Sequence, residues 1–345
     1  MNKTDRRRFR NQSFTVTGKV KVLGRRLESL VPVQDGVNLS IEHMPAGSDR
    51  WIVFDPKAGP HGDIRQVYRF GFSKDHRQHL GALSRATTQN RQFPQIVQYE
   101  QEGRNTVVVT TWIHGRPFKG YLDSVTSPKK RPSVDQMFRL YNGLCHGLCH
   151  LHSRAGVIHG DVHPGNLILA AEPGNHLALV DFGSAWKFEK TTSRATGDGH
   201  ARGYEAPELA FDDRAGKASE RSDQFSAAVV FYEMLTGKLP YAELGGRIVK
   251  EYGQDRMAEA QKEYVPPSQV LRSAWYRPPA RILSLIDGVI APSLRLNPDE
   301  RYAGKGQWLD ALQKLDVAFK TDPELGLLNR ALLSAVSKTA AFFKR

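Results

Sequence analysis

Cysteine is scarce in this chain, which has only Cys145 and Cys149 among its 345 residues. Two thiols cannot supply the disulfide framework that supports a small secreted domain. Long hydrophobic runs are also missing, because the most apolar stretches, residues 227–235 and 325–336, fall short of the about 20 apolar residues that a membrane span needs. No secretory signal follows the arginines near the first residue. We therefore expect a cytoplasmic protein stabilised by a hydrophobic core.

Acidic residues are fewer than basic ones: the chain has 36 Asp and Glu and 49 Lys and Arg, which gives a net charge of +13. Nine of the cations and two of the acids lie in residues 1–30, which gives that segment a net charge of +7. No aromatic platform is interleaved with these cations, so we interpret the segment as a solvated basic extension and expect no nucleic-acid partner. An anionic membrane surface is the alternative partner.

The two cysteines lie beside two histidines, His146 and His150, and the cluster resembles a metal site at first glance. Helical spacing puts Cys145 and Cys149 on one face and turns the histidines about a hundred degrees away. The four side chains would not converge, so we interpret the cysteines as core residues.

The candidate catalytic residues lie in three short motifs in the middle of the chain. Residues 159–166 read His-Gly-Asp-Val-His-Pro-Gly-Asn, residues 181–183 read Asp-Phe-Gly, and residues 206–208 read Ala-Pro-Glu. Phosphoryl transfer needs a carboxylate beside the attacking hydroxyl and oxygen ligands for magnesium, because the enzyme mainly positions groups and neutralises charge. Asp161, Asn166 and Asp181 are side chains of these types, in that order.

Two later motifs complete an ordered set: Ser-Asp-Gln-Phe at residues 222–225 and Asn-Pro-Asp-Glu-Arg-Tyr at residues 297–302. Together the five motifs resemble the protein kinase family, and the resemblance runs from about Val31 to about Leu315. It implies a bilobal α+β fold like that of protein kinases, with a β-rich small lobe and a mainly helical large lobe. It also implies a structural ion pair between Glu208 and Arg301.

Length and composition agree with two lobes, because 345 residues that are 40% hydrophobic can bury one or two substantial cores. We divide the chain into a basic N-terminal extension (1–30), a small lobe (31–115), a large lobe (116–318) and an amphipathic helical tail (319–345). In the tail, Leu325, Leu328, Leu332 and Val336 recur at helical spacing before basic residues. This pattern suits docking on the large lobe or a membrane-surface helix.

Residue patterns predict the elements of both lobes. In the small lobe we expect strands at 37–41, 51–54, 66–70, 96–100 and 106–112, with a helix over 76–88. From 134 to 315 we expect mainly helix, beginning with a buried helix over 137–152. Irregular stretches are expected at 182–204 and 264–279.

The resemblance implies a role for each residue of the catalytic motifs. Asp161 would accept or orient the proton of the substrate hydroxyl, while Asn166 and Asp181 would hold magnesium against the phosphates of ATP. His163 stands where Ser/Thr kinases generally carry a lysine for the γ-phosphate, and its partial charge would weaken the stabilisation. His159 would pack beneath Phe182 rather than act as an acid or base.

The same resemblance implies a nucleotide site. Thr111, Trp112 and Ile113 would form the hinge that hydrogen-bonds adenine, and Ile168 is assigned to the same cofactor site. Arg69 falls where the family has the lysine that grips the α- and β-phosphates. Lys57 and Lys74 are the alternatives for that contact. No glutamate between residues 71 and 99 can pair with the cation, and the turn at 45–49 has a single glycine.

Three functions therefore stay open. The first is an ATP-dependent protein kinase that transfers the γ-phosphate to a protein Ser or Thr hydroxyl, with ATP and magnesium as cofactors. The second is a nucleotide-binding pseudokinase that acts as a scaffold or switch, favoured by Arg69 and the missing glutamate. The third is a small-molecule phosphotransferase, because His-Gly-Asp with Asn five residues after the aspartate also looks like antibiotic and choline kinases. The motifs at 206–208 and 222–223, with Arg301, argue against the third.

Overall fold

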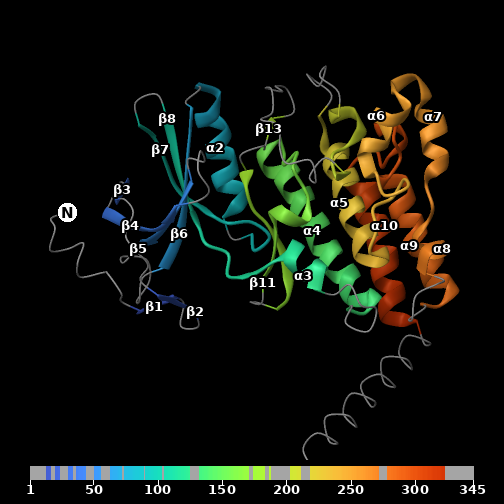
Figure 1. The fold of residues 1–345 in the computed structure, drawn as a ribbon, viewed down its shortest axis with the longest axis horizontal. Helices are drawn as coiled ribbons and strands as arrows, with labels where there is room; N and C mark the ends of the chain where they lie inside the picture. The colour runs from blue at the N-terminus through green and yellow to red at the C-terminus, as the bar shows by residue number, and fades with distance from the viewer. Residues whose placement is uncertain are drawn as a thin grey trace, which may run out of the picture. The chain divides into compact units, whose positions relative to one another are not determined.

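The computed structural model describes residues 13–16, 20–23, 30–33, 36–43, 50–55, 63–71, 74–88, 90–102, 105–124, 132–170, 174–182, 186–187, 203–210, 218–271 and 278–322. The chain divides into two compact units, whose elements are labelled in Figure 1. The first unit comprises Met1–Gly115 with Ser153–Gly156 and Ala170–Gly174, and the second comprises Arg116–His152, Val157–Leu169 and Asn175–Arg345.

The first unit contains an antiparallel sheet of six strands in the order β3-β4-β5-β6-β8-β7 (Figure 1). These strands are β3 (Leu30–Val33), β4 (Gly36–His43), β5 (Arg50–Asp55), β6 (Asp63–Gly71), β7 (Ile96–Glu102) and β8 (Asn105–Thr111). Helix α2 (Lys74–Thr87) contacts β7. The five predicted strands and the predicted helix are confirmed, with ends shifted by a few residues.

The central strand β8 shows why the sheet is stable. Val107, Val108 and Val109 are all buried, so both faces of this strand are covered. β-Branched side chains pack well on a pleated surface of this kind.

Three described strands of the first unit were not predicted. β3 pairs with β4 in a hairpin in which Val33 lies opposite Gly36, the first residue of β4, and the Asp35-Gly36 dipeptide where β4 begins is a turn signal that was not used in the prediction. Within residues 1–30, β1 (Ser13–Val16) pairs with β2 (Val20–Leu23). The expectation of a plain basic extension was therefore incomplete.

The second unit is mainly helical, as predicted, and its first long helix is α4 (Val134–Ala155). Its last residues, from Ser153, are grouped with the first unit. Leu140, Leu144, Leu148 and Leu151 are buried along it. Both cysteines are buried as well, and burial raises the pKa of both thiols, that of Cys149 to about 12. The interpretation of the cysteines as core residues is confirmed.

Helix α5 (Glu220–Thr236) is almost entirely buried in the second unit. Its N-terminus has a capping box, in which the Ser219 side chain accepts a backbone N–H of the first turn and Ser222 accepts the Ser219 N–H. Its C-terminus ends at Gly237, which has left-handed backbone angles. Phe231 of α5 stacks on Tyr141 of α4 with ring centroids 4.3 Å apart, which joins the two helices.

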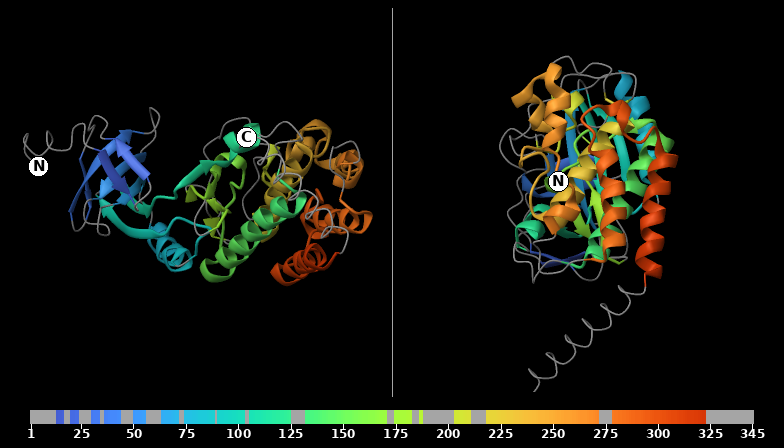
Figure 2. Two further views of the ribbon diagram at one scale, coloured as in Figure 1. Left: turned by 90° about the horizontal axis from the view of Figure 1, so that it is seen from below. Right: turned by 90° about the vertical axis from the view of Figure 1, so that its right-hand side faces the viewer.

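Helix α3 (Phe118–Ser124) precedes α4. Five further helices follow α5 in the described part of the chain. They are α6 (Ile248–Tyr252), α7 (Met257–Ala260), α8 (Pro267–Val270), α9 (Ala280–Ser293) and α10 (Lys305–Thr321). Helices α9 and α10 contact each other and run side by side, as the orange and red ribbons of Figure 2 show. The stretch at 264–279, expected to be irregular, contains α8, and the stretch at 182–204 contains the short strand β13 (Trp186–Lys187).

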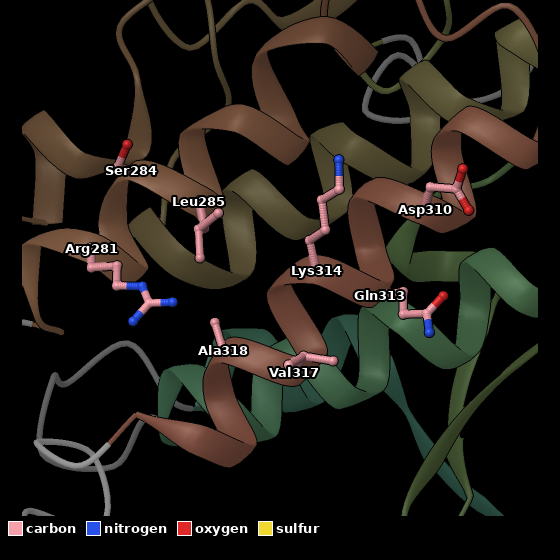
Figure 3. Close-up of a pocket in the computed structure, with 8 residues that line it drawn as sticks. All are labelled: Arg281, Ser284, Leu285, Asp310, Gln313, Lys314, Val317 and Ala318. Carbon is pink, nitrogen blue, oxygen red and sulfur yellow. The ribbon is translucent and has the colours of Figure 1, made fainter.

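A hollow lies between α9 and α10 (Figure 3). Its lining residues are Arg281, Ser284, Leu285, Asp310, Gln313, Lys314, Val317 and Ala318. None of them was predicted to belong to the catalytic site.

The predicted tail beyond α10 lies outside the described residues, although α10 itself runs past residue 319, the expected start of that tail. Among the described helices, none is long and apolar enough to cross a membrane.

Candidate active site

The 159–166 segment forms a loop between two short strands of the second unit. Strand β10 (Val157–Ile158) pairs with β13 and precedes the loop. A 3₁₀ turn (Pro164–Asn166) ends it and leads into β11 (Leu167–Ala170), which belongs to a three-stranded sheet of order β12-β11-β9. The other strands of that sheet are β9 (Gly115–Pro117) and β12 (His176–Leu179). Asp181 follows β12, so its motif begins at the same small sheet as the loop.

A buried carboxylate of α5, Asp223, holds the start of this loop. Its Oδ2 accepts the N–H of His159 at 2.8 Å, and its Oδ1 accepts the N–H of Gly160 at 2.9 Å. The Nε2 of His152, from α4, lies 2.8 Å from the same Oδ2. Gly160 has a φ of 71°, a left-handed conformation that glycine adopts without strain. Asp223 and His152 therefore position the loop, a role that the sequence analysis assigned to neither.

Asp223→Asn is expected to remove a pH-dependent part of the stability. Burial would raise the pKa of Asp223, but the hydrogen bond and charge of His152 and the Gly160 N–H outweigh it and lower that pKa. A carboxyl with a lowered folded-state pKa stabilises the fold above its unfolded value of about 3.9, and the contribution is lost as the pH falls through the folded value.

Urea unfolding of both proteins at a series of pH values would measure this effect. The gap in unfolding free energy between wild type and variant should be widest above about pH 5 and should narrow as the pH falls. A gap that stays constant down to the lowest pH at which both proteins fold would contradict the assigned role of Asp223.

Asp161 and Asn166 contact each other directly. The Nδ2 of Asn166 donates to Asp161 Oδ2 at 3.0 Å and to the Asp161 carbonyl oxygen at 3.0 Å. Because Nδ2 faces Asp161, the amide oxygen of Asn166 points away from it and can serve as a cation ligand. The carbonyl oxygen of Asn166 accepts the N–H of Val180, the residue before Asp181, at 2.9 Å. The loop and the Asp-Phe-Gly motif are therefore joined at the residues that carry the predicted chemistry.

His159 packs as predicted and lies close to the acidic residues. It is buried, and its ring contacts that of Phe182 with centroids 5.5 Å apart. Burial lowers the pKa of His159, although the charges of Asp223, Asp161 and Asp181 act in the opposite direction. Both predicted catalytic carboxylates therefore lie close enough to this imidazole to raise its pKa. Asp181 itself has a φ of 69°, an uncommon conformation for a residue with a side chain.

The donor set around Asp161 suits magnesium. An amide oxygen and a carboxylate are hard oxygen ligands, the kind that magnesium prefers, and it usually completes its shell with phosphates and water. No group of three His, Cys, Asp or Glu side chains in the described part of the chain could hold a metal ion. Asn166 and Asp181 supply only two ligands, so they would hold magnesium only together with the oxygens of a bound triphosphate.

His163 caps the 3₁₀ turn inside the loop. Its Nδ1 accepts the N–H of Gly165 at 3.1 Å, and its Nε2 lies 3.7 Å from Asp161 Oδ2. Its ring lies beside that of Tyr204, whose hydroxyl donates to Glu233 at 2.7 Å. His163 therefore lies next to Asp161, while its predicted contact with the γ-phosphate stays a prediction.

Glu208 and Arg301 form the predicted ion pair, with two nitrogen–oxygen distances of 2.8 Å. The side chain of Arg301 is fully buried and uses all five of its N–H donors. The three donors not on Glu208 reach the backbone oxygens of Arg295, Arg221 and Leu296. Ser222 donates to the same carboxylate at 2.7 Å. This pair ties the Ala-Pro-Glu motif to the segment that precedes α10.

The backbone just before the Ala-Pro-Glu motif is held by two glycines. A Cβ on Gly245 would lie 1.9 Å from the Gly203 carbonyl oxygen, and one on Gly246 would lie 1.8 Å from that of Glu205. Gly245 also has a φ of 57°. Glycine is therefore required at both positions, because the two main chains touch.

The predicted nucleotide contacts divide between the two units. Thr111 ends β8, and its N–H already donates to the Gln95 carbonyl at 2.9 Å. The predicted backbone contacts of Thr111, Trp112 and Ile113 with adenine stay a prediction. Arg69 lies in β6 opposite Val107, and Ile168 lies half-buried in β11. Only the backbones of Arg69 and Lys74 are described, while Lys57 and the 45–49 turn lie outside the described residues. The phosphate-gripping cation therefore stays a prediction.

Comparison with known proteins agrees with this geometry. The family model described as "Protein kinase domain" matches residues 84–309. A probable serine/threonine-protein kinase of Corynebacterium efficiens, CE0033, is 29% identical over 204 residues, which cover 56% of this chain and 27% of the relative. Serine/threonine-protein kinase PknA of Mycobacterium tuberculosis is 28% identical over 217 residues, which cover 62% of this chain and 44% of PknA. The chain thus matches less than half the length of these curated relatives.

The fold also resembles that of a solved kinase domain. The solved kinase domain of Mycobacterium tuberculosis PknI is similar to this structure with a TM-score of 0.52 and 16% identity, covering 81% of this chain and 96% of that domain. At this identity the likeness supports the fold alone. The family model, by contrast, covers well over half of the sequence. With its ordered motifs, its β-rich and helical units and its matched domain, the chain belongs to the protein kinase family.

Proposed function

We propose that this protein is an ATP-dependent protein kinase that transfers the γ-phosphate of ATP to a Ser or Thr hydroxyl of a protein substrate. The observation that carries the proposal is the contact of Asn166 with Asp161 on one side and with the residue before Asp181 on the other. The proposal is supported by the relatives, whose printed names are those of serine/threonine-protein kinases.

In this proposal Asp161 accepts the proton of the substrate hydroxyl while the hydroxyl oxygen attacks the γ-phosphorus. The bond from that phosphorus to the bridging oxygen breaks, and ADP leaves with the bond's electron pair. Asn166, through its amide oxygen, and Asp181 are the residues that would hold magnesium. Magnesium, when bound, neutralises charge on the phosphates.

We assign adenine to the hinge at Thr111, Trp112 and Ile113 and to Ile168, and the α- and β-phosphates to Arg69. Arginine is planar and larger than lysine, so the phosphate contact would differ in geometry from the family's usual one.

A nucleotide-binding pseudokinase is the second candidate, and one observation favours it. Helix α2 takes the place of the helix that supplies the family's glutamate partner for the phosphate-binding cation, yet Asp75 is the only acid in it. Active kinases need that ion pair in place. A member without it could bind ATP and still transfer no phosphate.

Incubation of the purified chain with radiolabelled ATP and magnesium would separate the two candidates. We expect label on the protein itself or on a generic basic substrate, and none when magnesium is chelated, because charge on the phosphates would be unneutralised. A thermal shift with ATP measures binding in parallel. Binding without any transfer would contradict the kinase and establish the pseudokinase.

Location and partners rest on sequence alone. We propose a cytoplasmic protein whose basic N-terminal arm or C-terminal helix contacts an anionic membrane surface. Both segments lie largely outside the described residues.

A further inference from the structure

The ring of His163 is oriented by the backbone of its own loop. Its Nδ1 accepts the Gly165 N–H at 3.1 Å. A ring nitrogen that accepts a hydrogen bond carries no proton, so the proton of the neutral imidazole lies on Nε2. A cationic ring would carry protons on both nitrogens and could not make this bond. The hydrogen bond therefore selects one tautomer.

That tautomer places the N–H on the ring nitrogen that lies near the predicted catalytic aspartate. Nε2 lies 3.7 Å from Asp161 Oδ2, which is the oxygen that also accepts Asn166 Nδ2 at 3.0 Å. The distance exceeds that of a direct hydrogen bond, yet an N–H dipole so close still attracts a carboxylate. The side chains of His163 and Asp161 are each 19% exposed, so solvent screens the attraction only in part. One carboxylate oxygen thus accepts a hydrogen bond from Asn166 and has the Nε2 of His163 nearby.

Gly165 makes this arrangement possible. A Cβ at this position would lie 2.7 Å from Cε1 and 3.0 Å from Nδ1 of His163, closer than a side chain can approach. The ring of Tyr204 lies beside that of His163, with centroids 6.2 Å apart, and its hydroxyl is held by Glu233. An alanine at position 165 would therefore have to move the imidazole.

We propose that His163 is a positioning residue for Asp161: the Gly165 N–H fixes its tautomer, and its Nε2–H holds the carboxylate on the side of Asn166. This inference rests on the proposed function. It replaces the expectation that His163 contacts the γ-phosphate as a partly charged substitute for lysine. In this proposal the imidazole acts through the aspartate and not on the phosphate.

Nitrogen NMR of the full chain with ¹⁵N-labelled histidine tests the geometry without any activity. At about pH 8, where histidines are ordinarily neutral, we expect His163 to show a protonated Nε2 and an unprotonated Nδ1, with its signals assigned by their absence from His163→Gln. Asp161→Asn should shift the Nε2 signal, because Nε2 faces that side chain. A ring protonated on Nδ1, or an Nε2 signal that ignores Asp161→Asn, would overturn the proposal.

A double-mutant cycle tests the positioning role in the phosphate-transfer assay. Gly165→Ala should lower kcat by about ten- to a hundredfold in the presence of His163, because small misplacements of a catalytic group cost that much. KM for ATP should not change. In a His163→Ala background the same substitution should have almost no effect, since no ring remains to be displaced. Gly306→Ala in α10 is the matched control, because nothing lies within 4 Å of its Cβ position.

Substitutions of His163 separate positioning from phosphate contact. His163→Gln keeps an N–H donor near the place of Nε2 and should restore part of the kcat that His163→Ala loses. If His163→Lys equals or exceeds wild type and Gly165→Ala acts equally in both backgrounds, the histidine serves as a cation and the proposal fails. If wild type transfers no phosphate at all, the proposed function fails, and the NMR result alone decides whether His163 faces Asp161 as described.

Discussion

Asp161→Asn and Asp181→Asn should each lower phosphate transfer by about a thousandfold or more while leaving the fold unchanged. Asparagine keeps the size and hydrogen-bonding shape of aspartate, but it cannot accept the hydroxyl proton at position 161. At position 181 it removes the negative charge that would hold magnesium. The rate of transfer from ATP and the circular dichroism spectrum measure the two effects.

The two variants should differ in one respect. Extra magnesium should partly restore Asp181→Asn, because weakened metal affinity responds to concentration, whereas Asp161→Asn should not respond. The exposed residue Asp255 supplies the control, and Asp255→Asn should transfer phosphate like wild type. Activity that survives in Asp161→Asn would place the proton acceptor elsewhere and refute the assigned mechanism.

Arg301→Met should destabilise the second unit by about 3–5 kcal/mol, because it leaves Glu208 buried without its cation. The Glu208 side chain is only 6% exposed, so water cannot take the place of the guanidinium. Lysine should not rescue the site, since it offers three donors where Arg301 uses five. Unfolding in urea, followed by tryptophan fluorescence, measures the loss.

Two further variants test the cause of this loss. Combining Arg301→Met with Glu208→Gln should recover part of the stability, because no buried charge is then left unpaired. Arg256→Met breaks an exposed ion pair with Glu259 and should have little effect. If the double variant is no more stable than Arg301→Met alone, the backbone contacts of Arg301 matter more than its ion pair.

Local patterns predicted much of the fold. The buried leucines of α4 follow the helical period, and the strands of the first unit follow the alternation of apolar residues. The Glu208–Arg301 pair was predicted from the family's motifs although 93 positions separate the two residues. The helix and the strands could be predicted because each depends on a short segment of sequence. The ion pair could be predicted because the family's motifs identify both of its residues.

Other contacts have no such signal. Asp223 bonds to backbone amides 63 and 64 positions away, and every residue type except proline carries such an N–H group, so the sequence does not mark the partners. The tautomer of His163 likewise depends on the backbone of Gly165, which a residue pattern does not reveal. The β3–β4 hairpin differs, because the Asp35-Gly36 dipeptide is a turn signal that is present in the sequence, although no strand was predicted before residue 37.

The close approach of Gly245 and Gly246 to the chain at residues 203–205 has a consequence at a distance. Any larger residue at either glycine would displace the backbone of residues 203–205, which lies just before Glu208 in the chain. Because Glu208 is bonded to Arg301, the displacement would reach the segment in front of α10. Three segments that are remote in the sequence are therefore connected through direct contacts. The two glycines are the positions in this chain of contacts where a larger side chain is least tolerated.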